Sequence, residues 1–206
     1  MKLITIILLL ISSTFIFAQN KEHKEYYVNG KIRLSGYVDG NGKQTGEAKE
    51  YDENGILKTL SHFKDGEILD GTTYFSNGKI QSAVTFKNGK INGETKNYYE
   101  NGNLAETGSY KDGEPVGEWK EYYESGKLAK VINISSQEIH SKSYYESGNL
   151  ASEGRYQSDE ETKVGEWKDY YENGKLKQVA NYNGNQMNLP SKVKKYDENG
   201  KVTFEN

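Results

Sequence analysis

Turn-forming glycines divide the chain into short stretches that are rich in tyrosine and aliphatic residues. A Tyr-x-x-x-Gly segment, such as YYESG at 122–126, occurs eight times. The glycines of these segments are Gly30, Gly55, Gly78, Gly102, Gly126, Gly148, Gly174 and Gly200. Because consecutive glycines lie 22 to 26 residues apart, the pattern predicts an internal repeat of about 24 residues, with seven or eight units.

Each unit has the pattern of two strands separated by turns. An apolar residue follows the repeat glycine by two positions, as Leu128 follows Gly126. A second turn comes later in most units, for example KDGE at 111–114. Asn-Gly and Asp-Gly pairs supply the positive φ angles of hairpin turns, and Tyr, Phe, Val, Ile and Thr between them favour strands. Turns recur about every 12 residues, which excludes ordinary helices, so the chain is predicted to be all-β.

Two nearly identical dodecamers, VGEWKEYYESGK at 116–127 and VGEWKDYYENGK at 164–175, resemble a duplicated site. They start 48 residues apart, which is two periods of the repeat. We therefore interpret them as two copies of the common unit, which differ from the other copies chiefly in carrying Trp119 and Trp167.

The length of the turn decides which side chains are buried. A two-residue turn at Ser125-Gly126 places Tyr123 opposite Leu128, whereas a three-residue loop with a bulge at Gly126 places Tyr122 there. The first tyrosine of the pair is present in all eight units, while the second is replaced by aspartate at positions 52 and 197. This favours the three-residue loop, with the first tyrosines and the leucines on the inner face. In that register lysines such as Lys120 also lie on the inner face, which is an argument against the three-residue loop.

In the favoured register Trp119, Tyr123, Trp167 and Tyr171 point to the outer face, and these four are the candidate binding residues. Side chains of this kind offer large rigid surfaces to a protein segment, a glycan or a lipid headgroup. The alternative is that tyrosine and tryptophan ladders replace aliphatic side chains and stabilise a thin sheet by stacking across strands.

The first residues form a separate segment. Lys2 precedes an apolar run that extends from Leu3 to about Phe17 and ends near Ala18. This layout predicts a secretory signal peptide over residues 1–18 and an exported repeat domain over 19–206, with an uncleaved membrane anchor as the alternative. The chain has no cysteine, so disulfides and lipoprotein anchoring are excluded.

Charge and composition recommend no catalytic or nucleic-acid site. The net charge is −3, with acidic and basic residues intermixed, so no basic stripe favours nucleic acid. The three histidines, His23, His62 and His140, lie in different units without metal-ligand spacing. No nucleophile elbow, phosphate-binding loop or calcium motif is present. We expect no enzymatic activity, no metal site and no cofactor.

The unit GEWKEYYESGKLAK, followed in most copies by a turn such as YKDG, resembles the MORN-repeat variant of bacterial YwqK-type antitoxins, over about residues 24–206. The resemblance implies one elongated, twisted antiparallel sheet of successive hairpins. Residues 131–143, VINISSQEIHSKS, depart from the pattern, since they lack the second-turn glycine and the Gly-Glu that restarts the other units. We expect this unit to bulge or to interrupt the sheet.

The sequence therefore predicts an exported, non-enzymatic repeat protein, periplasmic, cell-surface or secreted, whose sheet binds or scaffolds a protein partner in the cell envelope. The family resemblance adds a toxin-neutralising or immunity role as an alternative. Envelope glycan binding, or contact with a membrane surface, is a further alternative. Terminal strands exposed at the sheet edges also make end-to-end association plausible.

Overall fold

The turn residues divide the chain into 17 strands, as the computed structural model shows for residues 20–135, 138–158, 161–185 and 187–206. The strands are β1 (Lys21–Tyr26), β2 (Ile32–Val38), β3 (Gln44–Tyr51), β4 (Leu57–Lys64), β5 (Glu67–Tyr74), β6 (Ile80–Lys87), β7 (Lys90–Ile91), β8 (Gly93–Tyr98), β9 (Leu104–Lys111), β10 (Glu114–Tyr122), β11 (Leu128–Ile134), β12 (Ile139–Tyr144), β13 (Leu150–Tyr156), β14 (Lys163–Tyr170), β15 (Leu176–Asn183), β16 (Pro190–Tyr196) and β17 (Val202–Glu205). The predicted signal peptide lies outside the described residues. Over the part of the chain that the structure describes, no helix is long and apolar enough to cross a membrane.

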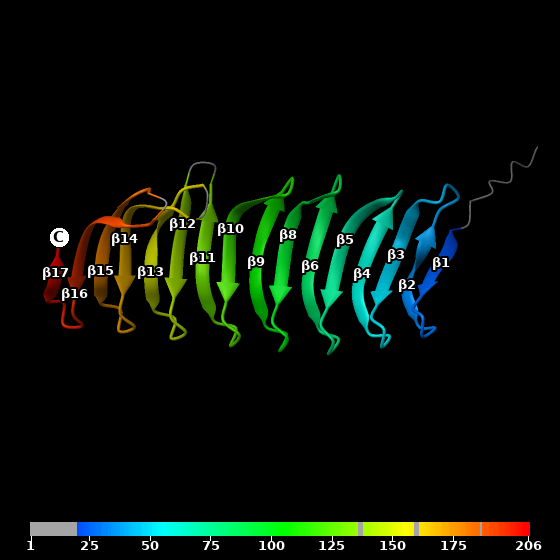
Figure 1. The fold of residues 1–206 in the computed structure, drawn as a ribbon, viewed down its shortest axis with the longest axis horizontal. Coiled ribbons are helices and arrows are strands. Elements are labelled where there is room, and N and C mark those ends of the chain that lie inside the picture. The colour runs from blue at the N-terminus through cyan, green and yellow to red at the C-terminus, as the bar shows by residue number, and fades with distance from the viewer. Residues whose placement is uncertain (1–19, 136–137, 159–160, 186) are drawn as a thin grey trace, which may run out of the picture.

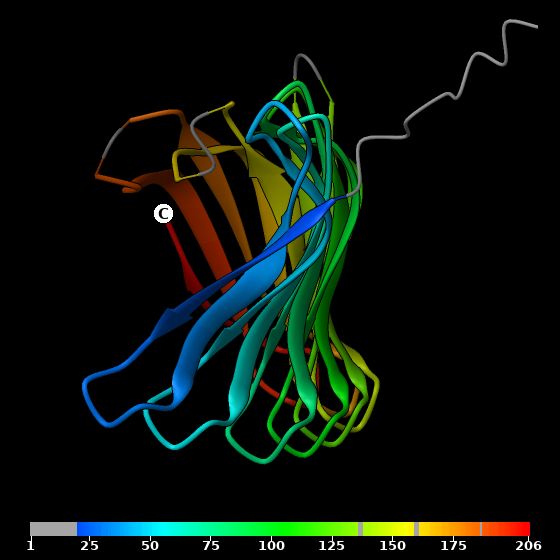
Figure 2. The same cartoon turned by 90° about the vertical axis from the view of Figure 1, so that its right-hand side faces the viewer.

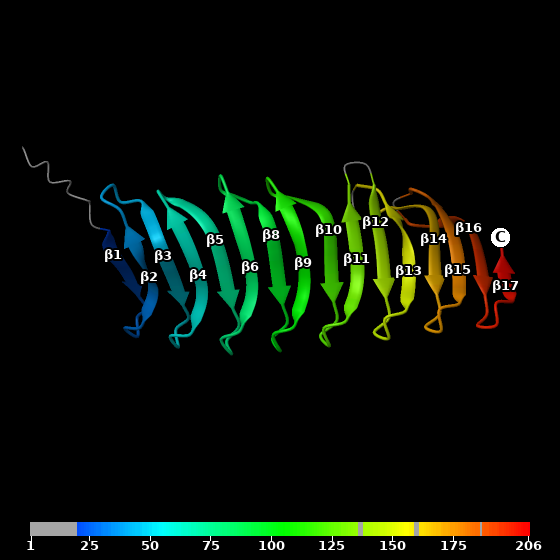
Figure 3. The ribbon, with the colours of Figure 1, turned by 180° about the vertical axis from the view of Figure 1, so that it is seen from behind.

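Each strand pairs antiparallel with the next strand in the chain, except that the two-residue β7 pairs only with β6, and β8 continues the sheet beside β6. The strands therefore lie side by side in chain order, from β1 at one end to β17 at the other (Figures 1 and 3). Seen along the long axis, the sheet is a single curved and twisted layer (Figure 2). The prediction of an elongated, all-β sheet of hairpins is confirmed.

The repeat turns are three-residue loops. The amide of Gly126, at φ +85°, donates to the carbonyl of Tyr123, and the amide of Tyr123 donates to the carbonyl of Lys127. Tyr122 consequently lies opposite Leu128, as the favoured register predicts. The first tyrosine faces the apolar residue in all eight units. Next to each of these pairs the register shifts, which marks a bulge.

The Gly-Glu that restarts many units forms a second bulge. Gly46, Gly117 and Gly165 have φ angles of +69°, +73° and +66°, and the pairing with the preceding strand shifts beside each of them. The hairpin of β11 and β12, which lacks this glycine, pairs five successive residues without a shift, from Lys130 opposite Ser143 to Ile134 opposite Ile139. The expectation that 131–143 bulges or interrupts the sheet was wrong. A missing bulge glycine makes this junction regular.

The core lies on one face, which we call the tryptophan face. Trp119 and Trp167 are only 7% and 5% exposed, so the prediction that they are outward and accessible was wrong. They occupy the position three residues before the first tyrosine of the repeat turn, as do the buried Thr95 and Ser141. Equivalent positions on neighbouring strands of one face form a row across a sheet. This row, together with Ile139 and Ala180, contains most of the buried side chains.

The first tyrosines lie on the opposite face, which we call the lysine face. Side chains alternate along a strand, so Tyr170 shares its face with Lys168 and lies opposite to Trp167. The hydroxyl of Tyr170 donates to Glu153, the residue that pairs with Lys168 across the strands. The prediction located the turn register correctly but assigned the core to the wrong side of the sheet.

Candidate functional site

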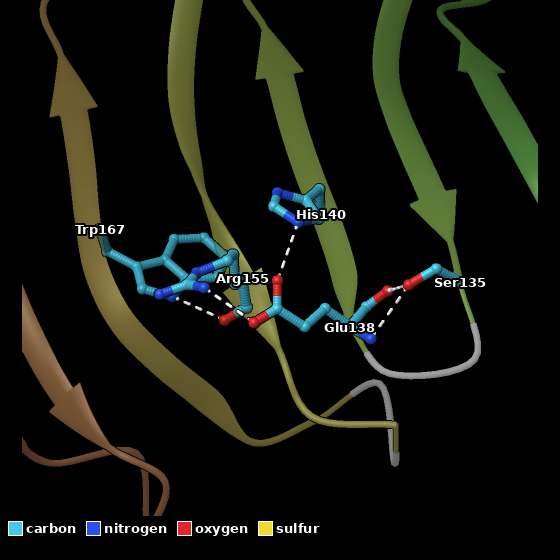
Figure 4. A network of polar contacts seen from close by, with 5 residues as sticks. All are labelled: Ser135, Glu138, His140, Arg155 and Trp167. Atoms are coloured by element: carbon cyan, nitrogen blue, oxygen red, sulfur yellow. Dashed lines mark hydrogen bonds and ion pairs between the residues drawn. The ribbon is translucent and has the colours of Figure 1, made fainter.

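Trp167 is buried because a glycine on the preceding strand leaves space for its ring and side chains on both neighbouring strands pack against it. Its indole lies across Gly154 of β13, where a side chain would overlap the ring. Tyr156 and Tyr182 contact the ring edge to face, with centroids at 4.9 and 6.4 Å, and the Lys163 ammonium lies 4.3 Å from its centroid. The indole Nε1 donates to the carbonyl of Arg155 at 3.0 Å (Figure 4).

Trp119 repeats this arrangement less completely. Its indole lies across Gly108 of β9 and contacts Tyr110 edge to face, with centroids 5.1 Å apart. Its buried Nε1 has no hydrogen-bond partner among the described residues. The two tryptophans lie on β10 and β14, four strand spacings or roughly 19 Å apart, so the structure does not bring them together.

The two candidate tyrosines also hold the sheet together. The Tyr123 hydroxyl donates to the carbonyl of Tyr144 at 2.6 Å, and the Tyr171 hydroxyl donates to the carbonyl of Tyr196 at 2.8 Å. Each bond joins a repeat turn to the first tyrosine of the next turn. The same bond is made by Tyr27, Tyr99 and Tyr145. Where aspartate replaces the second tyrosine, it instead accepts hydrogen bonds from amides of its own turn.

The lysine face carries ordered charge. A glutamate two residues before a lysine on the same strand forms an ion pair with it in five units, and these pairs are Glu22–Lys24, Glu47–Lys49, Glu94–Lys96, Glu118–Lys120 and Glu166–Lys168. Hydrogen bonding to the glutamate raises the pKa of each lysine, for example that of Lys120. Since successive units lie about 10 Å apart, the pairs form two parallel rows of opposite charge along the sheet.

The rows change at the bulge-free hairpin of β11 and β12. Here His140 replaces the glutamate that pairs with lysine in those five units. The Nε2 atom of His140 lies 3.2 Å from Glu138, and Arg155 donates to Glu138 at 2.8 Å (Figure 4). Ser135 closes the turn through its hydroxyl, which donates to the carbonyl of Glu138. The Arg155 guanidinium beside Glu138 holds the pKa of that carboxyl below its usual value.

Because His140 stands where the glutamate would be, Lys142 forms its ion pair across the sheet, with Glu153 at 3.3 Å. Glu153 also accepts a hydrogen bond of 2.8 Å from Tyr170. The Tyr170 hydroxyl, followed by Lys142, lowers the pKa of Glu153. Partial burial, and then the hydrogen bond to Glu153, raise the pKa of Tyr170 to about 12.

These changes surround a shallow hollow of about 310 Å³ on the lysine face. Its lining consists of Asn133, His140, Ser141, Lys142, Glu153, Gly154, Arg155, Glu166 and Lys168. Sequence reasoning did not single out this cluster. The available signal was the same departure at 131–143 that suggested an irregular unit. Over residues 20–206 apart from the few undescribed positions, no group of three or more acidic, cysteine or histidine side chains is placed to hold a metal ion.

Comparison with known proteins places the repeats in a family. Six segments match the family described as MORN repeat variant, at residues 44–65, 70–88, 91–112, 115–134, 137–158 and 163–183. Together they cover more than half of the chain. No curated protein matches it.

Several solved structures resemble the chain weakly. A crystal structure of TcdB2-TccC3-TEV matches at 11% identity with a TM-score of 0.21, and one of TcdB2-TccC3-Cdc42 matches at 12% identity with a TM-score of 0.20. A Photorhabdus luminescens Tc holotoxin pore carrying TccC3-D651A matches at 13% identity with a TM-score of 0.18. Each match covers 90% of this chain and 12% of the other chain.

Proposed function

Because the chain belongs to the MORN repeat variant family, we propose that it is an exported, non-enzymatic repeat protein whose sheet binds or scaffolds a protein partner in the cell envelope. The observation that carries this proposal is the hollow on the lysine face, where the regular ion pairs give way to a distinct cluster. The layout of residues 1–18 supports export.

The charges of the hollow favour an acidic segment of the partner. Lys142, Arg155 and Lys168 outnumber Glu153 and Glu166 among the lining residues. Arginine binds carboxylates through two parallel N–H donors, which adds direction to the attraction. In the hollow, Lys142 pairs with Glu153 and Arg155 pairs with Glu138 across strands, whereas the neighbouring units form their ion pairs within one strand. The hollow therefore differs from its two neighbouring units in the arrangement of its ion pairs.

The proposal is tested by affinity purification from the native envelope fraction with the full chain. Arg155→Ala and Lys142→Ala each remove one cation of the hollow. Lys96→Ala is the matched control, because Lys96 occupies the same row of the same face and pairs with Glu94 at 2.9 Å. We expect one envelope protein to be retained by the wild type and the control and lost by both hollow variants. Equal retention by all four proteins would exclude the hollow as the binding site.

The family resemblance supports toxin neutralisation as a second candidate function. Co-expression of the chain with a toxin encoded beside it tests this role, and rescue of growth is the expected result. Envelope glycan binding depended on outward aromatic side chains, and the burial of Trp119 and Trp167 removes that support.

A further inference from the structure

The two outermost strands leave one edge each without a described partner. β1 pairs with β2, and β17 pairs with β16. The two strands stand at opposite ends of the long sheet (Figures 1 and 3). The outer edge of such a strand presents backbone N–H and C=O groups that can pair with another strand.

The two outer edges of the sheet are complementary, because β1 and β17 occupy different places in the repeat unit. β1 enters a repeat turn, like β3, β5 and every later strand that ends at a first tyrosine. β17 leaves a repeat turn, like β2 and β4. Inside the sheet, a strand that leaves a turn always pairs on its other side with a strand that enters the next turn. A second copy of β1 placed beside β17 would continue this order and the alternation of strand direction.

The interior also fixes the register of such a junction. At all seven internal junctions, the residue two positions after the apolar residue pairs with the residue just before the first tyrosine. The pairs are Leu34–Glu50, Thr59–Thr73, Ser82–Asn97, Glu106–Glu121, Lys130–Ser143, Ser152–Asp169 and Gln178–Lys195. Applied to the outer strands, the rule places Phe204 of one copy opposite Glu25 of the second copy.

The next pair in this register is complementary in charge. Glu205 would face Lys24 of the second copy, as Glu153 faces Lys168 inside the sheet. Glu153 already binds Lys142 on its other side, and Glu205 binds Lys194 in the same way at 2.9 Å. The interior thus contains the same arrangement of charges, in which Lys168 also binds Glu166 of its own strand, as Lys24 binds Glu22. Phe204 and Val202, which are 47% and 41% exposed, would gain a neighbouring strand.

We propose that β17 of one copy pairs with β1 of a second copy of this chain, with Phe204 opposite Glu25 and Glu205 opposite Lys24. The contact joins two different edges, so it is heterologous and propagates from copy to copy as an open filament unless the rotation between copies closes a ring. Each added copy presents a new β17 edge, and the expected assembly is a linear filament of continuous sheet. This interaction is separate from the hollow on the lysine face.

Disulfide trapping tests the register directly, because the chain has no cysteine of its own. Directly paired strand residues have Cα atoms about 4.5–5.5 Å apart, within the range of a disulfide. The full chain carrying both Glu25→Cys and Phe204→Cys is expected to form a ladder of linked dimers, trimers and longer species under mild oxidation. Circular dichroism checks that the variant retains its strands.

Single variants and a shifted pair discriminate the alternatives. Efficient dimers of Phe204→Cys alone would mean pairing of two β17 edges, and efficient dimers of Glu25→Cys alone would mean pairing of two β1 edges. Either result overturns the proposal, as does a ladder of equal yield from Glu22→Cys with Phe204→Cys. In the chain carrying Glu25→Cys and Phe204→Cys, adding Glu205→Lys should reduce the yield of the ladder at least several-fold, and adding Lys24→Glu as well should restore it. A double-cysteine variant that stays monomeric also overturns the proposal.

Discussion

Gly154 should be one of the least replaceable residues of the sheet, although it lies in a strand and not in a turn. Its φ angle is not in the left-handed region, so alanine is compatible with the backbone. The obstacle is the indole of Trp167, because an added Cβ would overlap Cδ2 and Cε2 of the ring and lie 2.6 Å from its Cγ. Carbon atoms pack at about 3.5–4.0 Å. The ring must therefore retreat by about 1 Å or more.

The retreat disrupts three interactions whose sizes can be estimated. Losing the bond from Nε1 to the Arg155 carbonyl, 3.0 Å long, costs about 1–3 kcal/mol because the donor is buried. The edge-to-face contacts with Tyr156 and Tyr182 contribute about 0.5–1.5 kcal/mol each. The change from glycine to alanine also stabilises the fold by about 0.4–1 kcal/mol, because alanine restricts the conformations of the unfolded chain. We expect Gly154→Ala to lower the free energy of unfolding by about 3 kcal/mol.

Urea unfolding followed by circular dichroism and tryptophan fluorescence measures this change. Gly36→Ala is the matched control, because Gly36 occupies the same position in its unit but faces Ala48. A Cβ there would lie 3.2 Å from the Cβ of Ala48, a contact that a small shift relieves. We expect its free energy of unfolding to change by less than about 1 kcal/mol.

A double-mutant cycle shows whether the indole causes the loss. Gly154→Ala introduced into a Trp167→Ala background should have almost no further effect, because no ring then crosses the glycine. If Gly154→Ala is as stable as Gly36→Ala, or if it costs the same with and without the indole, the reasoning is refuted.

Three further changes concern hydrogen bonds that sequence reasoning missed. Tyr123→Phe removes the bond to the Tyr144 carbonyl, 2.6 Å long, and should lower the free energy of unfolding by about 1 kcal/mol in urea titrations; no change would show that this bond contributes nothing. Partial burial, and after it the hydrogen bond and charge of Glu153, raise the pKa of Tyr170 to about 12. Glu153→Gln removes the contribution of the charge, so absorbance titration should show a lower pKa, and an unchanged titration would contradict the assignment. The Tyr170 hydroxyl lowers the pKa of Glu153, and a lowered carboxyl pKa stabilises the fold above its ordinary value and loses that stability as the pH falls. Tyr170→Phe should therefore lose less stability than the wild type between about pH 6 and pH 3, and an equal loss in both proteins would argue against this coupling.

The sequence predicted the period, the strands and the turn register because each depends on local chemistry. Gly126 can adopt a positive φ, and a three-residue loop then fixes Tyr122 opposite Leu128. These constraints act within about ten residues, so they are visible in one unit.

The choice of the core face was wrong because it depends on contacts between units. Both faces carry aromatic residues, and comparison of units favoured the invariant first tyrosine as the inward one. In the structure that tyrosine shares the charged face, while the second tyrosine is retained to bind the next turn. The invariance of the first tyrosine was thus taken as a sign of burial. The buried position instead holds a different residue type from unit to unit, such as Thr95, Trp119 and Ser141.

A cross-strand comparison would have identified the buried tryptophans. Each lies next to a glycine that stands two residues before a tyrosine, in GSY at 108–110 and in GRY at 154–156. A small residue on one strand and a large one on the next keep the volume of a row filled without overlap. The same comparison explains the candidate site. Without the bulge glycine between β11 and β12, His140 pairs with Asn133 in an unbroken register, while its pairing with Arg155 follows the pattern of the other units. The sequence signal for the proposed site is therefore the missing glycine and not the two tryptophans.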